Sequence, residues 1–302
     1  MIRHIRYKDI DTKKWDACID GASNGIIFAY SWYLDSVCDQ WDALVEGDYE
    51  YVFPLPWKKK WGIRYVFQPF FMNQLGLFSV HSPANAKTDE FLRHIPGEFL
   101  YTELGLRQAP GTSNAAFRIE ERKSQFVSLQ PGIDAIRLAY SDNLKRNLKK
   151  AMAFRLSVKP VEASEVIRIF RSSRGNRPGV FHNDDYKNLF NLINTLSSHS
   201  KGESLGVYDP GGALHAAAHF MQSHDRIIYL KGAASEKGRE SGAMSMLMDH
   251  YISLHAGTGK NFDFGGSMAE SVARFNKGFG AKDYVYLHLS KNNLPHIIRW
   301  LK

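Results

Sequence analysis

Residues that could carry out chemistry gather in one stretch near the C-terminal end, Asn261–Gly280, which reads NFDFGGSMAESVARFNKGFG. Apolar and polar residues alternate at its start, which predicts a short buried strand through Asp263. Gly265 and Gly266 are then expected to form a turn, and Ser267 is expected to cap a helix. Backbone N–H groups at such a turn can face a bound anion or a developing oxyanion. Asp263 could orient an amine or accept its proton, although it could also only cap the turn. The simplest alternative is a tight strand-to-helix connection and nothing more.

The helix expected after this turn has one apolar stripe. Met268, Val272, Phe275 and Phe279 recur at spacings of three and four. This spacing predicts that they face a sheet while the charged residues of the helix lie elsewhere.

A second candidate anion site is a basic run between Leu144 and Lys159. It contains no acidic residue. If the run is functional, its partner carries phosphates, as a nucleotide diphosphate, a nucleotide-linked substrate, tRNA or an anionic lipid surface does. The alternative is a solvated helix face. The cations of the run are Lys145, Arg146, Lys149, Lys150, Arg155 and Lys159.

Three amides stand in an aromatic setting, FQPFFMNQLGLF, in the first half of the chain. Gln68, Asn73 and Gln74 each need a hydrogen-bond partner if they are buried. That partner can be irregular backbone around Pro69 or a ligand.

Several other kinds of site find no support. His215 and His219 would share one face of a strand, but no carboxylate or cysteine accompanies them at a useful spacing, so we interpret them as ordinary strand histidines and predict no metal. The chain has only two cysteines, which favours a reducing compartment and no disulfide framework. It lacks GxSxG, HExxH and Walker lysine motifs. Its aromatic residues follow strand and helix periods and are expected in the core, not in a set that stacks nucleic-acid bases.

Composition indicates a globular protein that could form two domains. A chain of 302 residues, 44% of them hydrophobic, has a length that favours two domains of about 150 residues each. The formal net charge is +8. No apolar run approaches the roughly 18 residues that span a bilayer, and the first residues lack a signal-peptide pattern, so we expect a cytoplasmic protein.

The order of predicted elements gives the fold. The first half has two short helices and several strands interrupted by prolines, and a basic helix over 141–154 joins the halves. The second half continues with two helices, a three-stranded antiparallel meander, a long helix, the strand and helix around Asp263, and a last strand. The predicted ranges of the second half are 164–172, 184–197, 204–208, 213–221, 226–231, 240–256 and 284–289.

This order is that of the GNAT acyltransferase fold, and the chain resembles the FemABX aminoacyltransferases, which form peptidoglycan bridges, and their related acetyltransferases. The resemblance rests on SWYL, LPWKKKWGIRYVFQPFFMNQLGLF, SDNLKRNLKKA, DFGGS and RFNKGFGA, taken in order. It implies an α/β (α+β) fold of two tandem GNAT-like domains, each a mixed, largely antiparallel sheet flanked by helices. We expect these domains at 1–140 and 141–302, with the donor site in the second.

The resemblance also implies a reaction, the transfer of an acyl or aminoacyl group from a thioester or ester to an amine. In GNAT enzymes a Q/R-x-x-G-x-G/A loop holds the donor's pyrophosphate, and Arg239, Ser241 and Gly242 lie in the corresponding segment. Met244 stands where the last small residue belongs and would crowd a phosphate. Fem-type enzymes use aminoacyl-tRNA and do not need that loop. Acyl-CoA and aminoacyl-tRNA therefore both remain candidate co-substrates, without a tightly bound cofactor.

The closing helix differs from the Fem pattern F-K-x-x-F-G. Asn276 occupies the position of the lysine that is thought to stabilise the transition state, and Lys277 follows it. One residue turns a helical side chain by about 100 degrees, so Lys277 does not simply replace that lysine. Asn276 could still donate a hydrogen bond to an oxyanion, although without the help of a charge. The resemblance also suggests that Gly266, Ser267 and Phe275 contact the donor.

Two hypotheses from different classes follow. The first is an acyl- or aminoacyltransferase with donor chemistry at Asp263–Lys277 and an acceptor held between the domains near Gln74, Lys145 and Arg146. The second is a non-catalytic protein of the same fold that binds a phosphorylated ligand or tRNA, which Met244 and Asn276 favour. Expected partners are a small-molecule or nucleotide-linked envelope precursor and tRNA, with at most peripheral membrane contact and no DNA.

Overall fold

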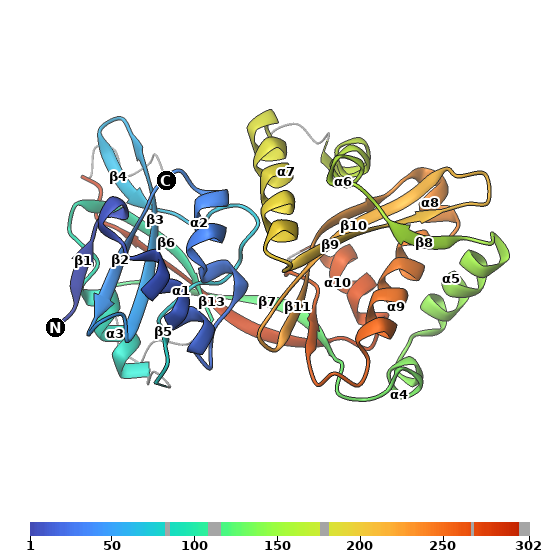
Figure 1. Cartoon of the computed structure of the whole chain (residues 1–302), viewed down its shortest axis with the longest axis horizontal. Helices are drawn as coiled ribbons and strands as arrows, with labels where there is room; N and C mark the ends of the chain where they lie inside the picture. Colours follow the sequence, from blue (N-terminus) through green and yellow to red (C-terminus); the bar gives the residue numbers. More distant parts are fainter. Residues whose placement is uncertain (82–84, 108–115, 176–180, 267–268, 296–302) are drawn as a thin grey trace. The chain divides into compact units, whose positions relative to one another are not determined.

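The computed structural model of the chain describes residues 1–81, 85–107, 116–175, 181–266 and 269–295. The chain forms two compact units, one from Met1–Arg122 with Val285–Lys302 and the other from Lys123–Tyr284. Figure 1 shows their helices and strands. The boundary predicted after residue 140 lies inside the second unit, between the helices Ile133–Leu138 and Asp142–Ala153.

The first unit contains a largely antiparallel sheet in the order β1-β2-β3-β4-β6-β13, with β5 beside β3. Only β4 and β6 run parallel in this set. The strands are β1 (Arg3–Ile5), β2 (Trp41–Glu46), β3 (Tyr51–Lys60), β4 (Ile63–Val66), β5 (Phe78–Ser79), β6 (Phe99–Leu106) and β13 (Lys282–Asn292). The helices are η1 (Tyr7–Asp9), α1 (Thr12–Gly21), η2 (Ile27–Ala29), α2 (Ser31–Val37) and α3 (Asn85–Arg93).

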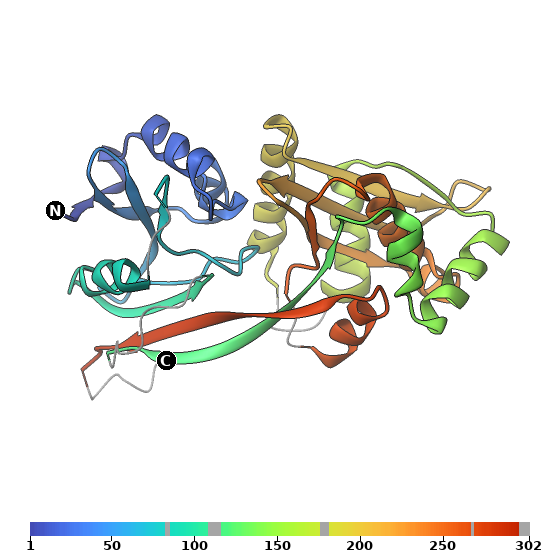
Figure 2. The same cartoon turned by 90° about the horizontal axis from the view of Figure 1, so that it is seen from below.

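The second unit contains strands in the order β7-β12-β11-β10-β9-β8. Strands β9, β10 and β11 form the predicted antiparallel meander, while β12 is parallel to β11 and antiparallel to β7. The strands are β7 (Arg118–Ser128), β8 (Ser157–Pro160), β9 (Gly202–Tyr208), β10 (Leu214–Ser223), β11 (Arg226–Ala234) and β12 (Asn261–Asp263). The long strands β7 and β13, green and red in Figure 2, are neighbours in the sheet order. The mixed sheet with flanking helices confirms the predicted fold class.

The helices predicted for the second unit occur in the predicted order, but two further helical segments occur, Ile133–Leu138 and Arg171–Gly175, and the long helix is divided. The helices of this unit are α4 (Ile133–Leu138), α5 (Asp142–Ala153), α6 (Ala163–Phe170), the π-helical turn η3 (Arg171–Gly175), α7 (Asn183–Ser198), α8 (Glu236–Glu240), α9 (Ala243–His255) and α10 (Glu270–Lys277). The predicted start of the long helix, expected over 240–256, is wrong, because α9 begins at Ala243. Gly242 has a left-handed conformation with φ 75°, which separates α8 from α9.

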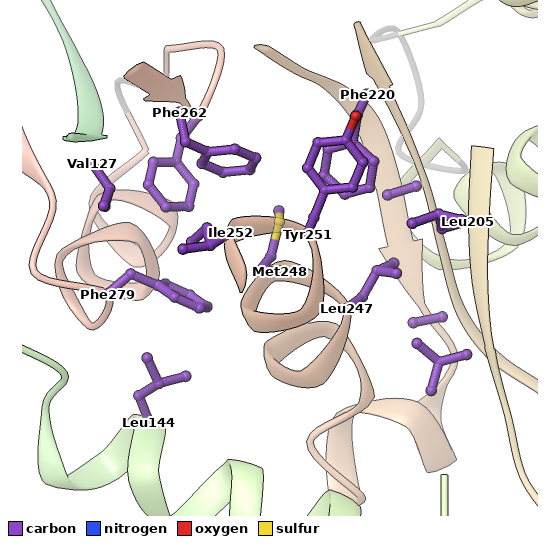
Figure 3. Close-up of a cluster of buried hydrophobic side chains, with 14 of the residues drawn as sticks. Val127, Leu144, Leu205, Phe220, Leu247, Met248, Tyr251, Ile252, Phe262 and Phe279 are labelled. Atoms are coloured by element: carbon purple, nitrogen blue, oxygen red, sulfur yellow. The ribbon is translucent and has the colours of Figure 1, made fainter. Parts of the chain in front are cut away.

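The core of this unit lies between the meander and α9. Phe220 of β10 stacks on Tyr251 of α9 with ring centroids 3.8 Å apart, and Phe262 of β12 packs beside both rings. Figure 3 shows these rings with Met248, Ile252 and Phe279. Aromatic and aliphatic burial on this scale fixes β12 and the chain after it against α9.

His219 lies in β10 beside Phe220, and its imidazole is shielded from solvent. It is fully buried, its Nδ1 lies 2.8 Å from Ser204 Oγ, and its Nε2 has no hydrogen-bond partner among the described residues. Burial lowers the pKa of the imidazole to about 3. Within the described part of the chain, no three His, Cys, Asp or Glu side chains are placed to hold a metal ion.

We expect this histidine to make the fold sensitive to mild acid. Below pH 6.5 the unfolded chain protonates His219, whereas the folded chain does so only near pH 3, so the free energy of unfolding falls as the pH falls through this window. Between pH 7 and pH 5 the loss amounts to about 2 kcal/mol. Chemical denaturation at both pH values measures it. His219→Gln should lose less stability on acidification, and His199→Gln, at an exposed position, should behave as the native chain does. Equal acid sensitivity in all three proteins would contradict the expectation.

Candidate active site in the second unit

The parallel strands β11 and β12 separate next to the predicted glycine turn. They pair at only three positions, the last of which joins Ile228 to Asp263, and β11 then continues to Ala234. Among the described residues no strand pairs with β11 on this side beyond Ile228. The backbone groups of an unpaired strand edge can bind an extended ligand.

Two glycines turn the chain away at this point. Gly265 and Gly266 have φ values of 77° and 76°. A Cβ on Gly265 would lie 2.6 Å from the carbonyl oxygen of Tyr229, so the turn approaches β11 too closely for any other residue. Ser267, the predicted helix cap, lies outside the described residues, and α10 begins after Ala269, whose side chain makes no cap.

Asp263 sits at the end of β12 with both carboxylate oxygens engaged. Ser124 Oγ and the backbone N–H of Gly265 donate to its Oδ1 at 3.0 and 2.9 Å. Arg226 Nη1 and Tyr284 Oη donate to its Oδ2 at 2.8 and 2.5 Å. The carboxylate is almost fully buried and forms an ion pair with Arg226.

The ionisable groups of this cluster shift the pKa values of Arg226 and Tyr284. Burial opposes the charge on Arg226, but Asp263 and Tyr284 offset that cost and the pKa of the guanidinium is raised. Burial, and then the charge of Asp263, raise the pKa of Tyr284. A carboxylate that accepts from four donors is well suited to fixing the turn. The role of Asp263 as a base stays a prediction.

Asn276 of α10 is the buried side chain of its helix. Its Nδ2 donates to Gln125 Oε1 at 3.0 Å, and Gln125 Nε2 donates to Asp283 Oδ1 at 3.2 Å. An amide nitrogen carries two hydrogens, and this bond uses one of them. The exposed ammonium group of Lys277 pairs with Asp283 Oδ2 at 3.0 Å. Asn276 and Lys277 thus contact the same hydrogen-bonded pair, Asn276 through Gln125 and Lys277 through Asp283, and a catalytic role for Lys277 stays a prediction.

We expect Asn276→Ala to reduce turnover while the chain stays folded. Removing the amide deprives a developing oxyanion of a donor and leaves Gln125 Oε1 unsatisfied, which costs about 1–3 kcal/mol of stability. Turnover and thermal denaturation of the same preparation measure both effects. Gln125→Leu combined with Asn276→Leu keeps the volume and removes both polar groups, so it should recover stability but not turnover. Unchanged turnover in Asn276→Ala would remove this residue from the mechanism.

The segment predicted to hold a pyrophosphate is packed against α5. Arg239 is exposed, but its Nη1 donates to the carbonyl oxygen of Ala234 at 3.1 Å, and Ser241 is buried with its hydroxyl 3.4 Å from Gly238 O. A Cβ on Gly242 would lie 2.4 Å from the carbonyl oxygen of Asn147 in α5. Gly242 is therefore needed for the close packing of this segment on α5. The role of the segment in donor binding stays a prediction.

Helix α5 carries four of the six cations of the basic run, while Arg155 follows the helix and Lys159 lies in β8. Ser141 Oγ accepts the N–H of Leu144 as the N-cap, and Leu144 and Ala151 are buried. The six predicted cations of the run are exposed, and the structure records no ion pair for any of them among the described residues. The N–H of Ser141 donates to the carbonyl oxygen of Gly278 at 2.9 Å. This bond places the start of the helix, with Lys145 and Arg146, beside the end of α10.

The predicted residues of the first half belong to the first unit. Gln68 Oε1 accepts the N–H of Gly105 at 2.7 Å, so this amide serves backbone, as one of the two interpretations expects. Gln74 is fully buried. A Cβ on Gly105 would lie 2.1 Å from the carbonyl oxygen of Asn73, because the loop packs directly on β6. An acceptor site at Gln74 stays a prediction.

Four members of the site were not predicted from the sequence. They are Ser124, Gln125, Arg226 and Tyr284. Gln125 lies 151 positions before Asn276, and no local pattern marks it. Phe275, which was predicted, is half-buried and packs edge-to-face on Phe279 at 5.3 Å.

Comparison with known proteins supports the fold. Residues 139–284 match the family model of the acetyltransferase (GNAT) domain. The fold of the whole chain is similar to that of FemX, with a TM-score of 0.72 at 13% identity over 97% of this chain and 98% of the other. No curated protein matches the sequence.

Two further solved structures share the fold. One is the C-terminal domain of a protein assigned as lysylphosphatidylglycerol synthetase from Agrobacterium fabrum, with a TM-score of 0.60 at 12% identity, covering 96% of this chain and 94% of that one. The other is a tandem GNAT protein from the clavulanic acid biosynthesis pathway, with a TM-score of 0.50 at 10% identity over 98% and 99% of the two chains.

Proposed function

We propose that this chain, an N-acyltransferase of the GNAT superfamily, transfers an aminoacyl group from aminoacyl-tRNA to an amine of a small-molecule or nucleotide-linked cell-envelope precursor. The observation that carries the proposal is the exposed basic face of α5, whose first turn is bonded to the end of α10. A row of cations without ion pairs attracts a polyanion, and Met244 stands where a pyrophosphate-binding loop has a small residue. Fold-level likeness to FemX supports the same class of reaction.

In the proposed reaction the acceptor amine attacks the carbonyl carbon of the aminoacyl ester. A C–N bond forms, the C–O bond to the ribose breaks, and the ribose hydroxyl leaves with the proton that the amine gives up. Asn276 donates to the oxyanion of the tetrahedral intermediate together with the backbone N–H of Gly266, since the N–H of Gly265 is bonded to Asp263. Asp263 and Arg226 hold that turn in place. Lys277, with Lys145 and Arg146, attracts the phosphates of the donor.

A second donor, acyl-CoA, is favoured by one observation, the match to a family model of acetyltransferase domains. Arg239 and Ser241 would then contact its phosphates at the start of α9. Both donors are made in the cytoplasm, where we propose that the reaction takes place. We propose no DNA partner.

Transfer of label to amines tests the proposal. The protein is incubated with radiolabelled aminoacyl-tRNA or radiolabelled acetyl-CoA and a panel of amino sugars, peptides and nucleotide-linked precursors, and labelled amides are counted. We expect product from aminoacyl-tRNA only. Asn276→Ala should reduce transfer from whichever donor is used, whereas Lys145→Glu with Arg146→Glu should reduce transfer from tRNA alone. Product from acetyl-CoA alone would overturn the proposed donor, and no product from either would overturn the proposed reaction.

A further inference from the structure

The hairpin of β3 and β4 in the first unit ends in an unusual turn. Lys60 pairs with Ile63, so Trp61 and Gly62 form a two-residue loop, and their φ values of 52° and 80° make it a type I′ turn. Asparagine or glycine normally fills the first of these positions, because a bulky side chain is strained there. Trp61 is nevertheless 70% exposed. The structure offers no internal packing reason for a tryptophan at this point.

The turn is surrounded by positive charge. Lys58, Lys59 and Lys60 precede Trp61 and are exposed, and none of the three forms an ion pair in the described part of the chain. Arg64 adds a fourth cation, which pairs with Glu98 at 2.5 Å. No acidic residue occurs between Trp57 and Val66. A cationic surface this compact attracts an anionic partner.

We propose that the tip of the β3–β4 hairpin, Lys58–Gly62, docks on the surface of an anionic phospholipid membrane. Tryptophan prefers the interface between lipid and water, where its ring is buried in the headgroup layer and its N–H remains hydrated. Lysines beside it bind the negative headgroups. No helix in the described residues is long and apolar enough to cross a bilayer, so the proposed contact is peripheral.

The geometry of the tip favours a membrane over a nucleic acid. The ammonium group of Lys60 lies 4.6 Å from the centre of the Trp61 ring and occupies one of its faces. A nucleic-acid strand is bound by cations that follow its backbone. Here the cations gather within a few residues at one point, and an ideal Cβ on Gly62 would contact nothing within 4 Å. Such an uncovered tip can enter a headgroup layer.

Vesicle co-sedimentation with two hairpin variants tests the proposal. Sedimentation is compared for phosphatidylcholine vesicles with and without phosphatidylglycerol. Trp61→Asn creates Asn–Gly, the preferred type I′ pair, so it should keep or raise the melting temperature while lowering partition onto anionic vesicles about tenfold. Replacing Lys58, Lys59 and Lys60 by glutamine should lower it about a hundredfold and remove the preference for anionic lipid.

The matched control removes the same charge elsewhere. Lys8, Lys13 and Lys187, which are exposed and lie outside both the hairpin and the basic run, are replaced by glutamine, and we expect native partition. Equal partition of native and Trp61→Asn proteins, or equal losses in both triple variants, would overturn the proposal. Loss of tRNA binding in Trp61→Asn with vesicle binding unchanged would assign the tip to nucleic acid instead. The assay needs no acyl donor, so its outcome is independent of the proposed reaction.

Discussion

Replacing Asp263 with alanine is expected to lower the free energy of unfolding by about 3–5 kcal/mol, because it leaves Arg226 charged and unpaired in a buried position. It also removes the acceptor that holds the N–H of Gly265 at 2.9 Å, so the turn beside β11 should loosen. Urea denaturation of the native and variant proteins measures the change. Activity should fall at the same time, since the turn no longer holds its backbone groups in place.

The control for Asp263→Ala removes both charges. Arg226→Met with Asp263→Leu replaces the ion pair by apolar side chains and should recover a large part of the stability. Ser124→Ala, which deletes a single neutral donor to the same carboxylate, should cost only about 1 kcal/mol. A loss below about 1 kcal/mol in Asp263→Ala would show that the ion pair does not support the turn.

Reversing two charges at the start of α5 is expected to have the largest effect on donor binding. Lys145→Glu with Arg146→Glu should weaken tRNA affinity about 10- to 100-fold, because two cations that attract phosphates become anions. The dependence of log affinity on log salt concentration should become shallower by about 2. Both side chains are exposed and have no ion pair among the described residues, so the fold should be unaffected.

Filter binding over a range of salt concentrations gives the affinity and its salt dependence together. Lys8→Glu with Lys13→Glu makes the same change in net charge at exposed positions of the first unit, and it should shift affinity by less than threefold by our estimate. An equal loss in both double variants would mean that overall charge, and not the face of α5, attracts the tRNA.

The elements of the second unit were predictable where periodicity is strong. The basic helix expected over 141–154 is α5, Asp142–Ala153, and the meander has the predicted three strands. Tertiary contacts decided what periodicity could not. Gly242 breaks the expected long helix, since it packs under the carbonyl of Asn147 in a left-handed conformation. Strand β7 joins β12 across more than 130 positions of sequence, which no local pattern records.

The candidate site was predictable in its location and not in its contacts. The glycine turn after Asp263 lies where the sequence indicates, with φ values that require glycine. The apolar stripe expected on α10 did not identify the most buried side chain of that helix, which is Asn276. A polar residue can take a core position when a distant partner satisfies it, and Gln125 provides that hydrogen bond. Such a pair cannot be predicted from the sequence before β7 is known to lie beside α10.

The nature of the donor is the central claim, and calorimetric titration tests it most directly. Uncharged tRNA and coenzyme A are titrated separately into the native protein at one fixed, low salt concentration. The account predicts saturable binding of tRNA and no heat of binding from coenzyme A, because the cations of α5 are exposed while Met244 stands where a pyrophosphate-binding loop has a small residue. Saturable binding of coenzyme A without binding of tRNA would contradict it and make the chain an acyl-CoA-dependent enzyme.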